Sequence, residues 1–195
     1  MNNYNSYSDE ELIPLIREEK PVCDYAFDVI YNRYDIKLFS YCLFLTRNRM
    51  EANGIFHDAW LKFFNHVKSG KNVEKILPFL ILTVKHLLVD KARELQRNNK
   101  LKNNLILLSD IDSKVENSGK LYENQEMLEL IHIAVDSLDD IYKEVFILKR
   151  YQELSNEEIA NLCNETVECI RKRITRATNM VKKILEPYIN EFNEK

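Results

Sequence analysis

The residues of this sequence that could do metal chemistry are His57 and Asp58, which are adjacent in the stretch IFHDAWLKFF. Such a pair forms the core of one class of metal-dependent phosphohydrolase, in which imidazole nitrogens and carboxylate oxygens bind the metal. That class needs a further histidine well upstream of the pair. The histidines are His57, His66, His86 and His132, so none precedes the pair. One essential ligand is missing, and we expect no metal, no other cofactor and no catalytic residue.

The neighbours of the pair explain it without a metal. Apolar residues around it recur at helical spacing, which predicts a buried stripe on one face of a helix. His57, Asp58, Leu61 and Lys62 then share the opposite face, which is either solvated or docks a partner. The stripe consists of Ile55, Phe56, Ala59, Trp60, Phe63 and Phe64.

Composition indicates an all-α protein. Of the 195 residues, 45% are apolar, which suffices for a core, and only 3 are glycine and 4 are proline. The net charge of −3 excludes a uniformly basic nucleic-acid binder, so any such contact must come from local patches.

The cysteines and the N-terminal residues indicate a cytoplasmic protein. Cys23, Cys42, Cys163 and Cys169 form no CxxC pair and no cluster with zinc spacing, so we expect free thiols in a reducing compartment. The sequence does not begin like a signal peptide, and no apolar run approaches membrane-spanning length. We therefore expect no membrane insertion.

Helical periodicity divides the chain into two small helical domains joined by a flexible linker. The N-terminal domain is expected over 1–97, the polar linker over 98–124 and the C-terminal domain over 125–195. In the first domain Ser8 opens a helix that Pro14 should kink or shorten. Further helices are expected over 26–45, 55–67 and 76–95, with a break within 48–54 and a loop over 69–72.

The C-terminal domain ends in a candidate helix-turn-helix. Ser137 is expected to cap the helix before it. Ser155 opens a short helix with a capping box, residues 163–165 form a tight turn, and Thr166 caps a longer helix, where free N–H groups suit a phosphate. This geometry is typical of DNA-binding motifs.

The longer helix has an apolar and a basic face. An ordinary helical hairpin with a solvated basic face would share that feature, but the capped short helix and tight turn favour DNA binding. The inward residues are Val167, Ile170, Ile174, Ala177 and Val181. The opposite face and its flanks carry Glu168, Arg171, Lys172, Arg173, Thr175, Arg176 and Asn179. The end of the middle helix, from Lys85 to Lys102, is also basic, which suits either a nucleic-acid backbone or a charged helix tail.

Four stretches occur in a characteristic order: AFDVIYNRY from Ala26, EANGIFHDAWLKFF from Glu51, FLILTVKHLLVDKAR from Phe79, and the segment 138–177. They resemble successive segments of the small, two-domain sigma factors of bacterial RNA polymerase, the extracytoplasmic-function type. The patterns AFxxLYxRY and YLFTxVxNxxxDxxR of that family match the first and third stretches. The resemblance spans most of the chain and leaves out residues 1–20 and the linker.

The resemblance implies a promoter-specificity subunit that binds core RNA polymerase and promoter DNA, without catalysis of its own. It also implies an anti-sigma protein as a possible partner. The helix around His57 would bind the clamp's coiled coil, through Asn53, His57, Asp58 and Lys62. The helix from Phe79, with the loop 68–75, would hold the melted −10 strand and a flipped base, through Lys85, His86, Asp90, Arg93 and Arg97. The helix-turn-helix would read the −35 element in the major groove, through Lys149 as a phosphate contact and Thr166, Arg171, Lys172, Thr175 and Arg176.

The chain departs from the family pattern at several positions. Asn53 and Gly54 replace an acidic pair, and His86 replaces an asparagine. Asn164 replaces the turn glycine, which is tolerable because asparagine accepts a left-handed backbone. Glu165 replaces an apolar residue and should therefore reach solvent.

Three alternatives stay open. An autonomous helix-turn-helix regulator would need a dimer seam or a sensor domain, and neither is evident in the sequence. A metal phosphohydrolase would need the missing ligand. A helical adaptor that has lost DNA binding would tolerate charge removal at Arg171 and Arg176.

Overall fold

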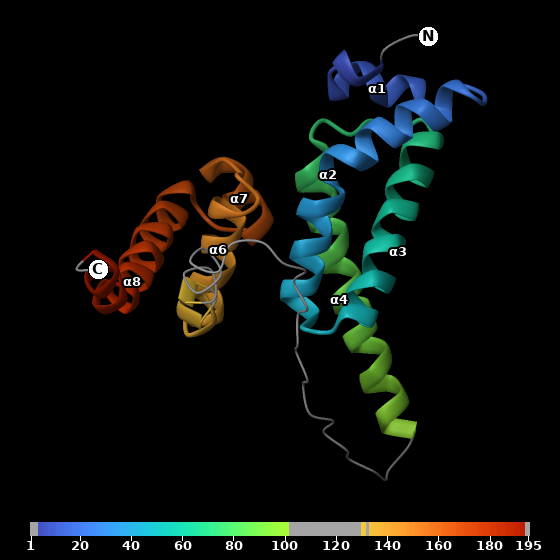
Figure 1. The fold of residues 1–195 in the computed structure, drawn as a ribbon. Helices are drawn as coiled ribbons and strands as arrows, with labels where there is room; N and C mark the ends of the chain where they lie inside the picture. The colour runs from blue at the N-terminus through green and yellow to red at the C-terminus, as the bar shows by residue number, and fades with distance from the viewer. Residues whose placement is uncertain (1–3, 102–129, 132, 194–195) are drawn as a thin grey trace. The chain divides into compact units, whose positions relative to one another are not determined.

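The protein is described by a computed structural model over residues 4–101, 130–131 and 133–193, which fall into two units. Every element in this part of the chain is a helix, as the composition predicted (Figure 1). Residues 102–129, which hold most of the expected linker, lie outside the described residues. None of the described helices is both long and apolar enough to cross a membrane.

The N-terminal unit is built on three long helices. These are α2 (Val22–Thr46), α3 (Arg49–Lys68) and α4 (Ile76–Leu101), and they run alongside one another (Figure 1). The short η1 (Tyr4–Ser6) and α1 (Asp9–Leu15) pack on α2 at one end of this bundle. The last helix continues to Leu101, past residue 97, where the first domain was expected to end.

Helix α3 begins earlier than predicted, and this corrects the expected break within residues 48–54. The Asn48 side chain accepts a hydrogen bond from the backbone N–H of Glu51 at 3.0 Å and so caps a helix that starts at Arg49. Asn53 and Gly54 lie inside it. A glycine in a helix costs about 1 kcal/mol relative to alanine, and the packing of the apolar face outweighs that cost.

The core of the N-terminal unit is aromatic. The Trp60 ring lies 5.0 Å from that of Tyr31 and 5.7 Å from that of Phe27, centroid to centroid, and Phe63 is fully buried. These pairs join α2 to α3 in tilted and edge-on contacts, which rings prefer over face-to-face stacking. The predicted apolar stripe around His57 is therefore confirmed.

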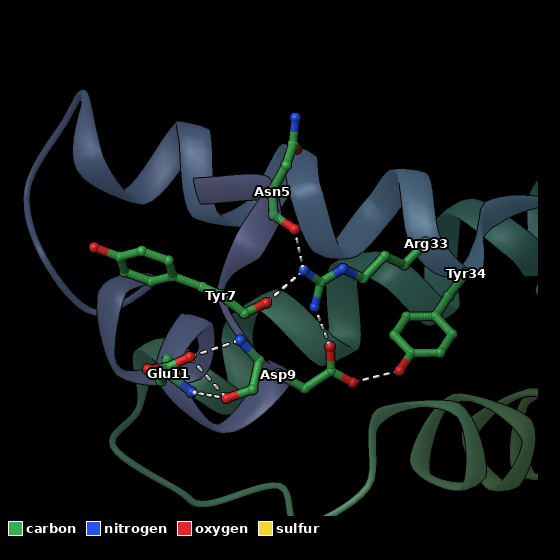
Figure 2. Close-up of polar contacts among 7 residues, drawn as sticks. Asn5, Tyr7, Asp9, Glu11, Arg33 and Tyr34 are labelled. Atoms are coloured by element: carbon green, nitrogen blue, oxygen red, sulfur yellow. Dashed lines mark hydrogen bonds and ion pairs between the residues drawn. The ribbon is translucent and has the colours of Figure 1, made fainter. Parts of the chain in front are cut away.

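The first helix is fastened to α2 through Asp9 (Figure 2). Its carboxylate accepts from the Arg33 guanidinium at 2.8 Å and from the Tyr34 hydroxyl. Arg33 also donates to the backbone carbonyl of Asn5 at 3.1 Å and to that of Tyr7. Burial, and secondarily the bond to Asp9, raises the pKa of Tyr34.

The C-terminal unit packs α6 (Asp140–Arg150) and α7 (Asn156–Cys163) against α8 (Val167–Asn193). Residues 130–131 and 133–136 are helical as well. The prediction that Ser137 caps α6 is wrong, because its hydroxyl donates backward to the carbonyl oxygen of Ala134 at 2.7 Å. Asp139 precedes α6 and makes no side-chain cap bond.

The described core of the C-terminal unit contains a buried cation, Lys143. Leu148, Ile159, Ile170 and Ala177 are fully buried, which joins all three helices. The Lys143 side chain is 2% exposed, and its ammonium is paired with the Asp136 carboxylate. A buried ammonium without that partner would be costly, so this pair fixes the approach of the preceding helical turn to α6.

Candidate nucleic-acid and polymerase interface

The helix-turn-helix predicted from the sequence is present in the C-terminal unit. Ser155 and Glu158 form the expected capping box at the start of α7. Asn164 ends this helix in a left-handed conformation with φ 52° and ψ 47°, as its replacement of glycine predicted. The backbone N–H of Glu165 donates to the carbonyl oxygen of Ala160 at 3.0 Å, which satisfies one of the last carbonyls of α7. The turn comprises 164–166, one position later than expected.

Thr166 caps α8, as predicted. Its hydroxyl accepts a hydrogen bond from the backbone N–H of Cys169 at 3.2 Å. The side chains of Ile170, Ala177 and Val181 are buried beneath this helix. The residue types that would read DNA therefore remain on the opposite side, and Thr166 itself is exposed.

The four −35 candidates on α8 are all exposed, but they are not equivalent. Lys172 pairs with Glu168 at 2.8 Å, and the Thr175 hydroxyl donates to the carbonyl oxygen of Arg171 at 2.9 Å. Arg171 and Arg176 make no side-chain hydrogen bond or ion pair with any residue that the structure describes. Since both ends of the guanidinium fork are available, these two are the best placed for base edges or phosphates.

Lys149 has a different environment from the one expected of a phosphate contact. It is half-buried on α6, and its ammonium donates to the backbone carbonyl of Leu154 at 3.1 Å. This bond ties the end of α6 to the segment before α7. If the bond to Leu154 persists, this ammonium can donate only its remaining N–H groups to a phosphate.

An ion pair stabilises the turn itself. Arg173 donates to the Glu165 carboxylate at 2.5 Å, and this bond raises the pKa of Arg173. Glu165 is exposed, as its departure from an apolar residue predicted. Its charge is thus neutralised beside the helix that carries the −35 candidates, where an unpaired carboxylate would repel a phosphate backbone.

The −10 candidates lie on α4. His86, Asp90, Arg93 and Arg97 are exposed and recur in steps of four, three and four, so they share one face of the helix. A guanidinium nitrogen of Arg93 lies 3.6 Å from a carboxylate oxygen of Asp90. Lys85 is half-buried on the neighbouring face.

Two apolar residues on this part of α4 were missed from the sequence. Leu82 is 40% exposed and Val89 is 47% exposed. Neither belongs to the apolar stripe predicted for this helix, and both lie on the face of the −10 candidates, so helical spacing could have found them. Exposed apolar side chains beside cations suit the faces of unpaired bases.

The polymerase-binding candidates share the exposed side of α3. Asn53, His57, Asp58 and Lys62 are all exposed, opposite the aromatic core. Two neighbouring apolar side chains are open as well: Met50 is 82% exposed and Leu61 is 58% exposed. Methionine at a surface adapts to irregular partners, and Met50 was not recognised in the sequence.

The described residues contain no group of three metal-ligating side chains that could hold an ion. The Phe56 and His57 rings lie 5.4 Å apart, in an edge-on contact. All four cysteines are free, and burial raises the pKa of the Cys42 thiol to about 12. Within the described part of the chain, the pair therefore sits on a solvent-facing helix surface.

Comparison with known proteins agrees with this arrangement. Residues 128–179, which include the helix-turn-helix, match the family model of sigma-70, region 4. The chain is 21% identical over 167 residues to the extracytoplasmic-function RNA polymerase sigma factor SigM of Bacillus subtilis, which covers 85% of this chain and 99% of that protein. It is 25% identical over 166 residues to SigW of the same organism, covering 82% of this chain and 89% of that protein.

Two solved structures have the same fold. The sigma factor RpoE of Bartonella quintana, solved with the anti-sigma factor NepR, superposes with a TM-score of 0.62 at 18% identity, covering 82% of this chain and 96% of that one. CnrH, solved with the cytosolic domain of CnrY, gives 0.61 at 15% identity, covering 92% and 97%.

The fold and the exposed basic helix define a helical protein whose C-terminal unit carries a helix-turn-helix. Over most of its length the chain is similar to sigma factors of the extracytoplasmic-function type, so the resemblance predicted from its four sequence stretches is confirmed.

Proposed function

We propose that this chain is a promoter-specificity subunit that binds core RNA polymerase in the cytoplasm and directs initiation at a specific set of promoters. The observation that carries the proposal is the exposed pair Arg171 and Arg176 on the second helix of a well-capped helix-turn-helix, within the stretch that matches sigma-70 region 4. No chemistry is required of the subunit itself. The subunit acts through the free energy of its binding to core polymerase and to promoter DNA.

The C-terminal unit reads the −35 element. Helix α8 enters the major groove, where Arg171 and Arg176 contact base edges or phosphates and Thr175 lies between them. Lys172 exchanges its exposed bond to Glu168 for a phosphate, at small cost because exposed ion pairs contribute little. Thr166 presents the N-terminal N–H groups of α8 to a phosphate.

The N-terminal unit holds the melted −10 strand. The α4 face formed by His86, Asp90, Arg93 and Arg97 follows the backbone, and Leu82 and Val89 cover the exposed faces of bases. The loop between α3 and α4 receives a flipped base. Contacts between that base and the loop offset the free-energy cost of unstacking it.

Helix α3 docks on the polymerase. Asn53, His57, Asp58 and Lys62 supply polar contacts, while Met50 and Leu61 supply apolar area. Interfaces of this kind combine an apolar centre with a polar rim. An anti-sigma protein that covers these faces would hold the subunit inactive.

Binding measurements with and without core polymerase test the proposal against an autonomous regulator. Core polymerase from the organism that encodes this chain is mixed with the purified protein and with genomic fragments of that organism. The proposal expects one-to-one binding to core and selective retention of fragments only when core is present. Selective retention by the protein alone, as a dimer, would support the autonomous regulator instead.

Metal analysis of the purified protein tests the enzyme alternative. A phosphohydrolase would carry stoichiometric metal that His57→Ala removes. Under the proposed function His57→Ala leaves the metal content unchanged and weakens binding to core polymerase.

A further inference from the structure

Hydrogen bonds hold the connection between α1 and α2 against the loop between α3 and α4. The bonds made by Arg17 and Lys68 are together called the grip. The Arg17 guanidinium donates from Nε to the carbonyl oxygen of Val67 at 3.2 Å and from a terminal nitrogen to that of Lys71 at 3.1 Å. In return, the Lys68 ammonium donates to the carbonyl oxygens of Glu18 at 2.8 Å and Arg17 at 3.5 Å. Every acceptor is a backbone atom, so the grip sets the path of the chain in both segments.

Arg17 spans the point where the loop turns. Gly70 has φ 85°, in the left-handed region that glycine adopts without strain, and its N–H donates to the carbonyl oxygen of Val67 at 3.0 Å. Val67 and Lys71 lie on either side of this turn. Farther along, the side chain of Val73 is buried, 4% exposed, which anchors the other end of the loop. The exposed residues between and beside these anchors include Ser69, Gly70, Lys71, Asn72, Glu74 and Lys75.

The chemistry of the grip suits arginine in particular. A guanidinium presents its donors in a rigid plane, so one side chain can hold two carbonyls at a fixed separation. The carbonyl of Val67 is also one of the last of α3, which lack partners inside the helix. An ammonium at position 17 would carry its donors on one rotatable nitrogen and so would fix the separation of the two carbonyls less firmly.

We propose that Arg17 is a positioning residue for promoter melting, because it holds the α3–α4 loop in the shape that receives an unpaired base of the −10 strand. The inference rests on the proposed function, since it takes this loop as the single-strand site. Arg17 acts through the loop backbone rather than by touching DNA. Residues 1–20, which the family resemblance leaves out, thereby gain a role: Asp9 fixes α1 on α2, and Arg17 follows directly after α1.

Amide hydrogen exchange on the full chain tests the grip independently of any DNA. The variant Arg17→Gln is compared with Lys20→Gln, which removes one positive charge from the same connection but only an exposed pair with Asp24. We expect the amides of residues 69–75 to exchange about tenfold faster in Arg17→Gln and at the wild-type rate in Lys20→Gln. Equal exchange in the two variants would overturn the grip.

Base selection tests the positioning role. Holoenzyme is assembled with the host's core polymerase and mixed with a pool of DNA molecules. Each molecule has a duplex upstream part, taken from a promoter that the wild-type protein uses, and a randomised single strand at −10. The bound fraction is sequenced. We expect Arg17→Gln to keep its affinity for core and to lose about tenfold in base enrichment, with partial recovery in Arg17→Lys.

Two other outcomes would count against the inference, and they are distinguishable. Faster loop exchange with unchanged base enrichment would overturn the positioning role while leaving the proposed function intact. No enrichment by wild-type holoenzyme would contradict the proposed function itself, and the role of Arg17 in melting would fall with it.

Discussion

The guanidinium of Arg33, on α2, donates to the carboxylate of Asp9, on α1, at 2.8 Å (Figure 2). Both side chains are less than a third exposed, at 29% and 27%. Arg33 belongs to the stretch AFDVIYNRY that carries the family resemblance, whereas Asp9 lies outside it. The contact therefore attaches the first helix, which lies outside the stretches that carry the resemblance, to a helix that contains one of them.

Asp9→Asn should destabilise the N-terminal unit by about 1–2 kcal/mol, because it removes a charge-assisted hydrogen bond and leaves the guanidinium short of an acceptor. Thermal unfolding of the full chain measures the effect. The matched control is Asp24→Asn, which breaks the exposed Lys20–Asp24 pair and should cost less than about 0.5 kcal/mol. Equal losses in the two variants would mean that Asp9 contributes no more than a surface charge.

Alkaline unfolding should depend on Tyr34, whose pKa is raised by burial and by Asp9. In the unfolded chain a tyrosine ionises near pH 10, so the folded chain holds this proton more tightly. The stabilisation is thus fully present below about pH 10 and is lost as the pH rises above it. Denaturant melts between about pH 9 and 11 should show a shallower loss of stability in Tyr34→Phe than in wild type. Tyr25→Phe, at an exposed ring, should keep the wild-type slope.

The turn of the helix-turn-helix should depend on the left-handed conformation of Asn164. Asn164→Ala should cost about 1 kcal/mol, since alanine keeps the Cβ atom that crowds the following carbonyl but lacks the polar group with which asparagine compensates locally, whereas Asn164→Gly should be neutral or slightly stabilising. Chemical unfolding of the full chain compares them. Asn161→Ala, in the body of α7, is the control and should not destabilise. A loss in the glycine variant as large as in the alanine variant would place the cost in the side chain instead.

Arg171→Gln and Arg176→Gln should each weaken binding of the holoenzyme to a −35 duplex and lower the slope of log affinity against log salt by about 1. Their folding should be unaffected, because neither side chain has a partner among the described residues. Lys183→Gln is the control: it is exposed on the same helix but lies beyond the stretch matched to region 4. If a variant with both substitutions kept full affinity for the −35 duplex and an unchanged salt slope, the helical adaptor would be favoured.

Asp58→Lys should weaken binding to core polymerase about tenfold or more, because a reversed charge on the docking face meets the wrong potential. The stability of the chain should not change, since Asp58 is exposed. Asp28→Lys, an equal charge reversal at an exposed position of α2, controls for net charge. Equal weakening by both variants would argue that long-range charge, rather than the α3 face, governs docking.

Spacing along the sequence was enough to predict the helices, the buried stripe around Trp60 and the helix-turn-helix. These features depend on periodicity and on caps such as Ser155 and Thr166, which are local in the sequence. The start of α3 was misjudged because Asn48 was not recognised as a cap and Gly54 was taken as a breaker. The cap at Ser137 was misjudged because a hydroxyl can bond forward or backward, and only packing selects the direction.

The remaining features could not be predicted because they join residues far apart in the chain. The hydrogen bonds that Arg17 donates to the carbonyls of Val67 and Lys71, and that Arg33 donates to Asp9, depend on how α1 packs on the bundle. The exposure of Met50 likewise follows from which helix faces meet. From the sequence Lys149 was expected to be available for a phosphate, and only the fold brings the Leu154 carbonyl to its ammonium.

Transcription in vitro tests the central claim most directly. The purified chain is added to core RNA polymerase of its own organism with genomic DNA as template, and the 5′ ends of the transcripts are mapped. The account predicts discrete new start sites, each preceded by two shared sequence elements at fixed spacing. An absence of both new start sites and binding to core polymerase would contradict it.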